Sequence, residues 1–108
     1  MFYLDIEKEA IPYTFETVLD NEHFQFTVNY NSFGDFFTVD IYKNSVPLRF
    51  GEKVVYGQPL FINHMYIGAP RLFIIPYDTT EKAERVGYDA MSEDVFLYQT
   101  LKSLMLIL

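Results

Sequence analysis

The stretch YTFETVLDNEHFQFTVNY, residues 13–30, decides the fold class of this chain of 108 residues. Within residues 24–30, aromatic and aliphatic side chains alternate with polar ones, which is the two-residue period of a strand with one buried face. Residues 13–19 alternate in the same way, and the four residues between them (Asp20, Asn21, Glu22 and His23) have turn chemistry. The stretch therefore predicts an antiparallel hairpin.

The chain beyond the hairpin continues this pattern. A turn at 31–35 precedes FFTVDIY, residues 36–42, in which Phe37, Val39 and Ile41 share one face. The segment KNSVP, 43–47, is a further turn, followed by a short apolar piece. The first third of the chain thus predicts a meander of three strands.

Two more strands are predicted in the second half. RLFIIPY, residues 71–77, is apolar on both faces, and its Pro76 is expected at a strand edge or end because proline donates no hydrogen bond. Residues 94–101 read as a last strand. Together with the shorter apolar pieces between them, these segments give six or seven strands spaced by roughly ten residues. This pattern indicates an all-β fold, a small antiparallel β-barrel or sandwich.

The segment EKVVYGQPLF, residues 52–61, interrupts an apolar run in its middle. Glycine permits a sharp bend, and proline cannot donate to a strand ladder. We therefore expect the chain to leave one sheet after Tyr56 and to join another at Leu60. The predicted corner residues are Gly51, Gly57 and Pro59.

Residues 79–86 leave two readings open. Asp78 and Glu81 have the spacing of a capping box, which favours a short helix over 79–86 that Gly87 would stop. The alternative is a loop without regular structure.

Composition predicts one folded domain over residues 1–108. Half of the residues are apolar and 19% are aromatic, which suits a packed β core. The absence of cysteine removes disulfides, thiol nucleophiles and thiolate metal sites. The N-terminus lacks the pattern of a signal peptide, so we expect synthesis in the cytoplasm. The apolar runs are much shorter than the roughly 20 residues of a membrane span.

The net charge of −7 is concentrated in the first part of the chain. Residues 1–42 contain eight acids and only one base, Lys8, whereas residues 43–108 contain seven of each. Because no basic face is expected to neutralise phosphates, nucleic-acid binding is not predicted. The acidic part either favours a basic protein partner or is an ordinary solvated surface.

Catalytic and metal-binding patterns are missing from the sequence. His23 and His64 are 41 positions apart and form no ligand pair, and the acids Asp89, Glu93 and Asp94 lack the spacing of a calcium loop. No serine has a nucleophile-elbow context, and no glycine-rich phosphate loop occurs. We expect no catalytic residues, no cofactor and no metal.

Two features could serve binding. Loop aromatics, for instance Phe33, Tyr66 and Tyr88, could stack on a sugar, although most aromatics in such a chain belong to the core. The apolar C-terminus, residues 100–108, should be buried within the domain or covered by a partner or a second copy. Its candidate partner-binding residues are Leu104, Met105, Leu106 and Leu108.

The order of these segments resembles a known family. The hairpin of 13–30, the strand DFFTVDIY, the segment PLRFGEKVVYGQPLF, the segment APRLFIIPYD and the final SEDVFLYQ are together similar to the baseplate plug family of contractile-tailed bacteriophages and related prophages. The resemblance covers about residues 11–99. Its most specific parts are Tyr30-Asn31, the Phe37 to Asp40 pattern, the Gly51 to Leu60 segment and the strand from Asp94 to Tyr98.

The resemblance implies a virion structural protein without enzyme activity. Such a protein assembles in the bacterial cytoplasm, sits in the tail baseplate and packs against hub, spike or tube proteins. The alternatives are a free-standing β-barrel module that binds a sugar or peptide and, third, a hydrolase that uses its acids.

Overall fold

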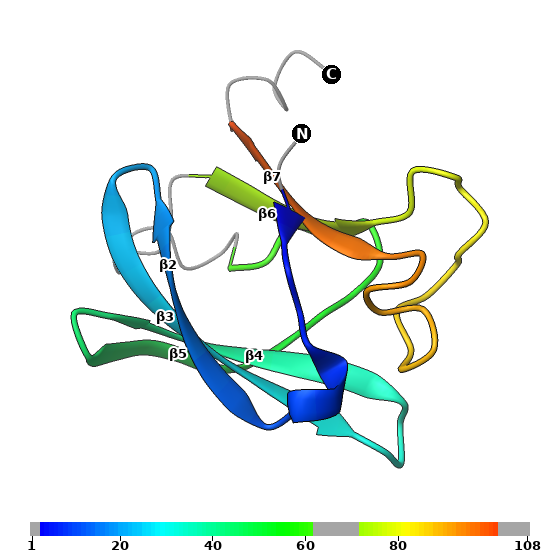
Figure 1. Ribbon diagram of the computed structural model, residues 1–108, viewed down its shortest axis with the longest axis horizontal. Coiled ribbons are helices and arrows are strands. Elements are labelled where there is room, and N and C mark those ends of the chain that lie inside the picture. Colours follow the sequence, from blue (N-terminus) through cyan, green and yellow to red (C-terminus); the bar gives the residue numbers. More distant parts are fainter. Residues whose placement is uncertain (1–2, 62–71, 102–108) are drawn as a thin grey trace.

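The computed structural model describes residues 3–61 and 72–101, which form two antiparallel sheets packed face to face (Figure 1). One sheet has the strand order β2-β3-β4-β5 and the other has the order β1-β7-β6. The elements are β1 (Tyr3–Leu4), the 3-10 helix η1 (Lys8–Ala10), β2 (Tyr13–Leu19), β3 (Glu22–Asn31), β4 (Phe36–Lys43), β5 (Val46–Lys53), β6 (Leu72–Tyr77) and β7 (Phe96–Leu101). The predicted all-β fold is confirmed, as a sandwich whose sheets do not close into a barrel.

The hairpin predicted from residues 13–30 is the β2–β3 pair. Its turn is shorter than the sequence suggested, because Leu19 already pairs with Glu22. Only Asp20 and Asn21 form the turn, with φ angles of 51° and 64°. Two residues with positive φ match the twist of the flanking strands, and Asp and Asn tolerate this conformation. The prediction of a four-residue turn was therefore wrong by two residues.

Strand β4 agrees with its prediction, whereas β5 is longer than expected. Phe37, Val39 and Ile41 are buried, as their alternation indicated. The segment 43–47 is only partly a turn, because β5 begins at Val46 after a turn at Asn44 and Ser45. The β4–β5 pairing contains two register shifts, and most side chains of β5 are exposed, so the alternation signal is weak there.

The second sheet joins distant parts of the chain. Strand β7 lies between β1 and β6, and Tyr98 is opposite both Tyr3 and Ile75. The strands predicted at 71–77 and 94–101 are confirmed as β6 and β7. Pro76 is the next-to-last residue of β6, at the strand end where its missing donor is tolerated. The two-residue strand β1 and the helix η1 were not predicted.

The chain crosses from the first sheet to the second between β5 and Leu60. The Val54 N–H still donates to the Phe37 carbonyl in the first sheet, at 2.9 Å. The N–H groups of Gly57 and Leu60 instead donate to carbonyls of β6, each at 2.8 Å. Gly57 has φ +75°, which favours glycine. We propose that Gly51, Gly57 and Pro59 set this corner, and the hydrogen bond and positive φ of Gly57 support that role for Gly57.

The core lies between the two sheets. Strands β3 and β4 contribute the largest part of it, and β6 and β7 cover it from the other sheet. The largest side chains that are almost completely buried include Phe24, Phe26, Phe37, Phe61, Leu19, Ile41, Ile74, Met91 and Leu97.

The short helix considered for residues 79–86 is not formed. Asp78 does cap the backbone, since its carboxylate accepts hydrogen bonds from the N–H groups of Thr80, Lys82 and Ala83. Glu81, however, has φ +58°, which a right-handed helix cannot contain. The segment is therefore a loop of turns and bends, the second of the two readings.

The Phe37→Ala variant tests the core. Phe37 is completely buried, and its ring lies 5.0 Å from that of Tyr30. We expect the free energy of unfolding to fall by about 3–5 kcal/mol, the usual cost of truncating a buried Phe. Urea denaturation measures this. The matched control is Phe33→Ala at a fully exposed position, with an expected change within about 0.5 kcal/mol. Equal losses in the two variants would contradict the assigned core.

The Gly57→Ala variant tests the corner. A Cβ at this position would contact nothing within 4 Å, so the cost comes from the positive φ alone. We expect a loss of roughly 1–2 kcal/mol in the same assay. Gly57→Asn should lose less, because Asn tolerates positive φ better than Ala. A fully stable Gly57→Ala protein would argue against the corner.

Candidate functional site

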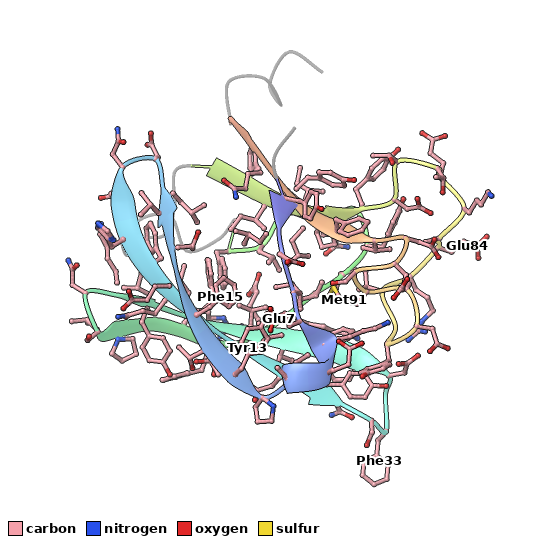
Figure 2. The ribbon with its side chains drawn as sticks, in the orientation of Figure 1. Glu7, Tyr13, Phe15, Phe33, Glu84 and Met91 are labelled. Atoms are coloured by element: carbon pink, nitrogen blue, oxygen red, sulfur yellow. The ribbon has the colours of Figure 1, made fainter. Side chains whose placement is uncertain are left out.

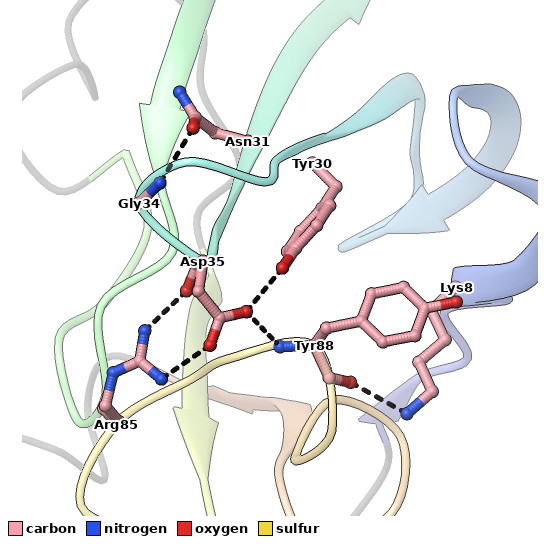
Figure 3. Close-up of polar contacts among 7 residues, drawn as sticks. All are labelled: Lys8, Tyr30, Asn31, Gly34, Asp35, Arg85 and Tyr88. Carbon is pink, nitrogen blue, oxygen red and sulfur yellow. Dashed lines mark hydrogen bonds and ion pairs between the residues drawn. The ribbon is translucent and has the colours of Figure 1, made fainter.

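A polar cluster centred on Asp35 connects the β3–β4 turn to the loop before β7 (Figure 3). The Asp35 carboxylate accepts hydrogen bonds from the Tyr30 hydroxyl at 2.6 Å, from the Tyr88 N–H at 2.9 Å and from Arg85 Nη1 at 2.8 Å. Arg85 Nη2 also donates to the Asp35 carbonyl at 2.6 Å. This cluster was not predicted from the sequence.

The electrostatics of Asp35 indicate a structural role. The hydrogen bonds from Tyr30, Tyr88 and Arg85 hold the pKa of the Asp35 carboxyl well below its ordinary value. The hydrogen bond between Tyr30 and Asp35 also raises the pKa of the Tyr30 hydroxyl. A carboxylate that stays ionised and already accepts three hydrogen bonds is a poor general acid or base at neutral pH. A shifted pKa marks a candidate catalytic site, but here its cause is an internal network.

Lys8 extends this network to the N-terminal segment. Its side chain is 9% exposed, and its ammonium group donates to the Tyr88 carbonyl at 2.8 Å (Figure 3). The Nζ atom also lies 4.9 Å from the centre of the Tyr88 ring and 4.0 Å from a Glu93 carboxylate oxygen. One lysine thus ties η1 to the loop that carries Tyr88.

A second carboxylate, that of Asp78, is almost completely buried, and both of its oxygens accept hydrogen bonds. One of its oxygens accepts from the Thr80 N–H and hydroxyl, and the other accepts from the N–H groups of Lys82 and Ala83. The hydrogen bond from the Thr80 hydroxyl is the main reason that the pKa of Asp78 falls to about 2, and the backbone donors contribute to the same shift. Asp78 therefore holds the loop 79–86 in shape and presents no free oxygen to a substrate.

The described residues contain no group of three or more His, Cys, Asp or Glu side chains that could hold a metal ion. His23 is exposed in β3, and Asp89, Glu93 and Asp94 stand on the loop before β7. His64 lies outside the part of the chain that the structure describes. Within that part, no helix is long and apolar enough to cross a membrane.

The space between the sheets does not form a ligand cavity among these residues. It is lined by core side chains such as Phe15, Phe26 and Leu97, and its volume is about 10 Å³. Small-molecule pockets usually measure roughly 300–1,000 Å³. This part of the domain therefore offers no interior pocket for a sugar or peptide, in contrast to what a ligand-binding barrel would require.

The proposed sugar platform is not assembled by the two described aromatics. Tyr88 is half-buried, with its ring 5.2 Å from that of Tyr30 and 6.2 Å from that of Phe37. Phe33 projects into solvent from the β3–β4 turn (Figure 2). Tyr66 lies outside the described residues.

Apolar side chains on the surface are the remaining candidates for a functional site. The predicted partner-binding residues Leu104, Met105, Leu106 and Leu108 lie outside the described residues. Among the described residues, five large apolar side chains are strongly exposed, mostly on strands at sheet edges. These residues are Tyr3, Val18, Phe33, Val46 and Phe50.

The comparison with protein families gives one result. A family model described as the cyanophage baseplate Pam3 plug gp18 matches residues 1–102 of the 108. No curated protein matches the chain.

The Asp78→Asn variant tests the assigned electrostatics. The pKa of Asp78 is below its ordinary value of 3.8 in the folded protein, so the unfolded chain takes up the proton first as the pH falls. The stabilisation is therefore complete above about pH 4 and is lost toward about pH 2. Melting temperatures of wild type and Asp78→Asn should differ most near neutral pH and converge in acid. A difference that is constant across this range would contradict the assignment.

Proposed function

The chain belongs to the cyanophage baseplate plug family, and from this membership we propose that it is a structural component of a phage or prophage tail baseplate. In this role it is a plug-like protein near the hub and spike, and it acts by packing against other baseplate proteins. It is assembled in the bacterial cytoplasm and is then carried in the virion.

The observation that carries the proposal is the extent of the family match. Residues 1–102 include every residue that the structure describes, so the whole sandwich belongs to the shared unit. The resemblance noted from the sequence covered only about residues 11–99, which is less than the 1–102 of the family match. The match includes β1 and η1, which complete the second sheet and the Lys8 network.

The chemistry of the described residues supports packing over catalysis. The two carboxylates with the strongest pKa shifts, Asp35 and Asp78, are satisfied by internal donors. In contrast, apolar surface is available at the ends and edges of the sandwich, in positions where a neighbour could cover it. We therefore propose that the protein has no enzyme activity of its own.

The charge distribution indicates what kind of neighbour fits. Residues 1–42 account for the whole net charge of −7, and they form β1, η1, β2, β3 and most of β4. Glu16 on β2, Glu7 just before η1 and Glu9 within η1 have no cation partner among the described residues. We propose a hub, spike or tube protein that presents basic side chains to this side. The apolar residues Leu104, Met105, Leu106 and Leu108 are a second proposed contact, with a baseplate neighbour or with another copy.

Mass spectrometry of purified tails tests the proposal. We expect peptides of this chain in tail particles, at a constant ratio to the other baseplate proteins, and not in tail-free capsids. A tail-tube protein in the same sample is the control for recovery. Complete tails that lack this chain would overturn the proposal and would revive the alternative of a free-standing binding module.

A further inference from the structure

Phe33 is the most exposed large apolar side chain among the described residues. It lies at the tip of the turn between β3 and β4, and its exposure of 103% means that the rest of the fold covers none of it. Figure 2 shows the ring projecting away from the body of the sandwich. Isolated apolar residues on a surface are common, so exposure alone is not evidence for a function.

The other exposed aromatics differ from Phe33 because they pack against neighbours. The ring of Tyr3 lies 4.7 Å from that of Phe96, and the ring of Phe50 lies 5.7 Å from that of Tyr42. Both are about half covered. Phe33 has no such ring contact within the described part of the chain, so it does not contribute to the folded domain.

The turn does not require Phe at this position. Its shape comes from the flanking residues: the Asn31 side chain accepts the Gly34 N–H at 3.0 Å, and Asp35 adopts φ +54°. A Cβ at Gly34 would collide with the Phe36 ring, so Gly34 is also fixed by packing. Small polar residues are the usual occupants of an exposed turn. Neither packing nor turn chemistry therefore explains a Phe at position 33.

The turn holds Phe33 in a defined position. Two residues further on, Asp35 is fixed by Tyr30, Arg85 and Tyr88 through the network of Figure 3. This network connects the tip to a loop about 50 residues away in sequence. A residue presented by a fixed loop loses little backbone freedom on binding, which is the property of an interface anchor.

We propose that Phe33 is an anchor residue that inserts into an apolar pocket of a different baseplate protein, with basic side chains around that pocket. The inference rests on the proposed function. The basic rim follows from the acidic charge of residues 1–42, in which the turn lies. The partner is a different protein because this chain, with a net charge of −7, is a poor source of the basic surroundings that the pocket requires.

Competition during assembly tests the anchor. Wild type and Phe33→Ala are expressed together in cells that produce tails, and their ratio in purified particles is compared with their ratio in the lysate. We expect the variant to be depleted by about 10- to 100-fold, as for the loss of a buried aromatic contact. Phe33→Leu should be depleted less. The control Ser32→Ala changes an exposed neighbour in the same turn without removing an aromatic ring, and it should be incorporated normally.

Site-specific crosslinking identifies what the ring contacts. A photoreactive benzoylphenylalanine at position 33 should form an adduct with another baseplate protein, whereas the same group in place of the exposed Thr79 should not. An adduct with a second copy of this chain, or equal incorporation of Phe33→Ala and wild type, would overturn the inference and leave the proposed function intact. If the wild-type protein is itself absent from tails, the proposed function and the anchor inference are both overturned. Unchanged melting temperatures of the variants exclude misfolding as the cause of depletion.

Discussion

Burial of the inward faces of β3 and β4 is the constraint on which the rest of the structure depends. Phe24, Phe26 and Val28 on one strand stand beside Phe37 and Ile41 on the other, and all are nearly inaccessible to water. Rings of this size contribute strongly to stability only when a second layer covers them. Strands β6 and β7 supply that layer, and the crossing at Val54 to Leu60 brings the chain to it.

The sequence was informative wherever one strand face is buried. Alternation located β2, β3 and β4, but it could not locate β1, because a pair of residues has no measurable period. The loop 79–86 shows a different limit. Asp78 accepts backbone N–H groups as a cap would, but the predicted capping box and helix do not form, because the positive φ of Glu81 depends on its surroundings. The Asp35 cluster was missed because its partners Arg85 and Tyr88 come from a distant loop.

The family membership and the described chemistry support one another. The proposed function depends on contact with neighbouring proteins. Within the domain, the strongest polar interactions fix loops and the N-terminal segment. Asp35, Asp78 and Lys8 each bond to backbone groups of segments without regular strands. The loops between strands are thereby given fixed shapes, which suits a protein that presents surfaces to neighbours. The exposed Phe33 belongs to one of these fixed loops.

The pairing of β1 with β7 has a consequence for the order in which the protein acquires its structure. Tyr3 and Leu4 pair with Tyr98 and Leu97, so β1 cannot pair until the ribosome has synthesised residues 97 and 98. The four-stranded sheet, by contrast, joins only neighbouring hairpins and can form while translation continues. A nascent chain halted before residue 96 would lack β7, and the aromatic face of β3 and β4 would then be exposed in part and prone to aggregation.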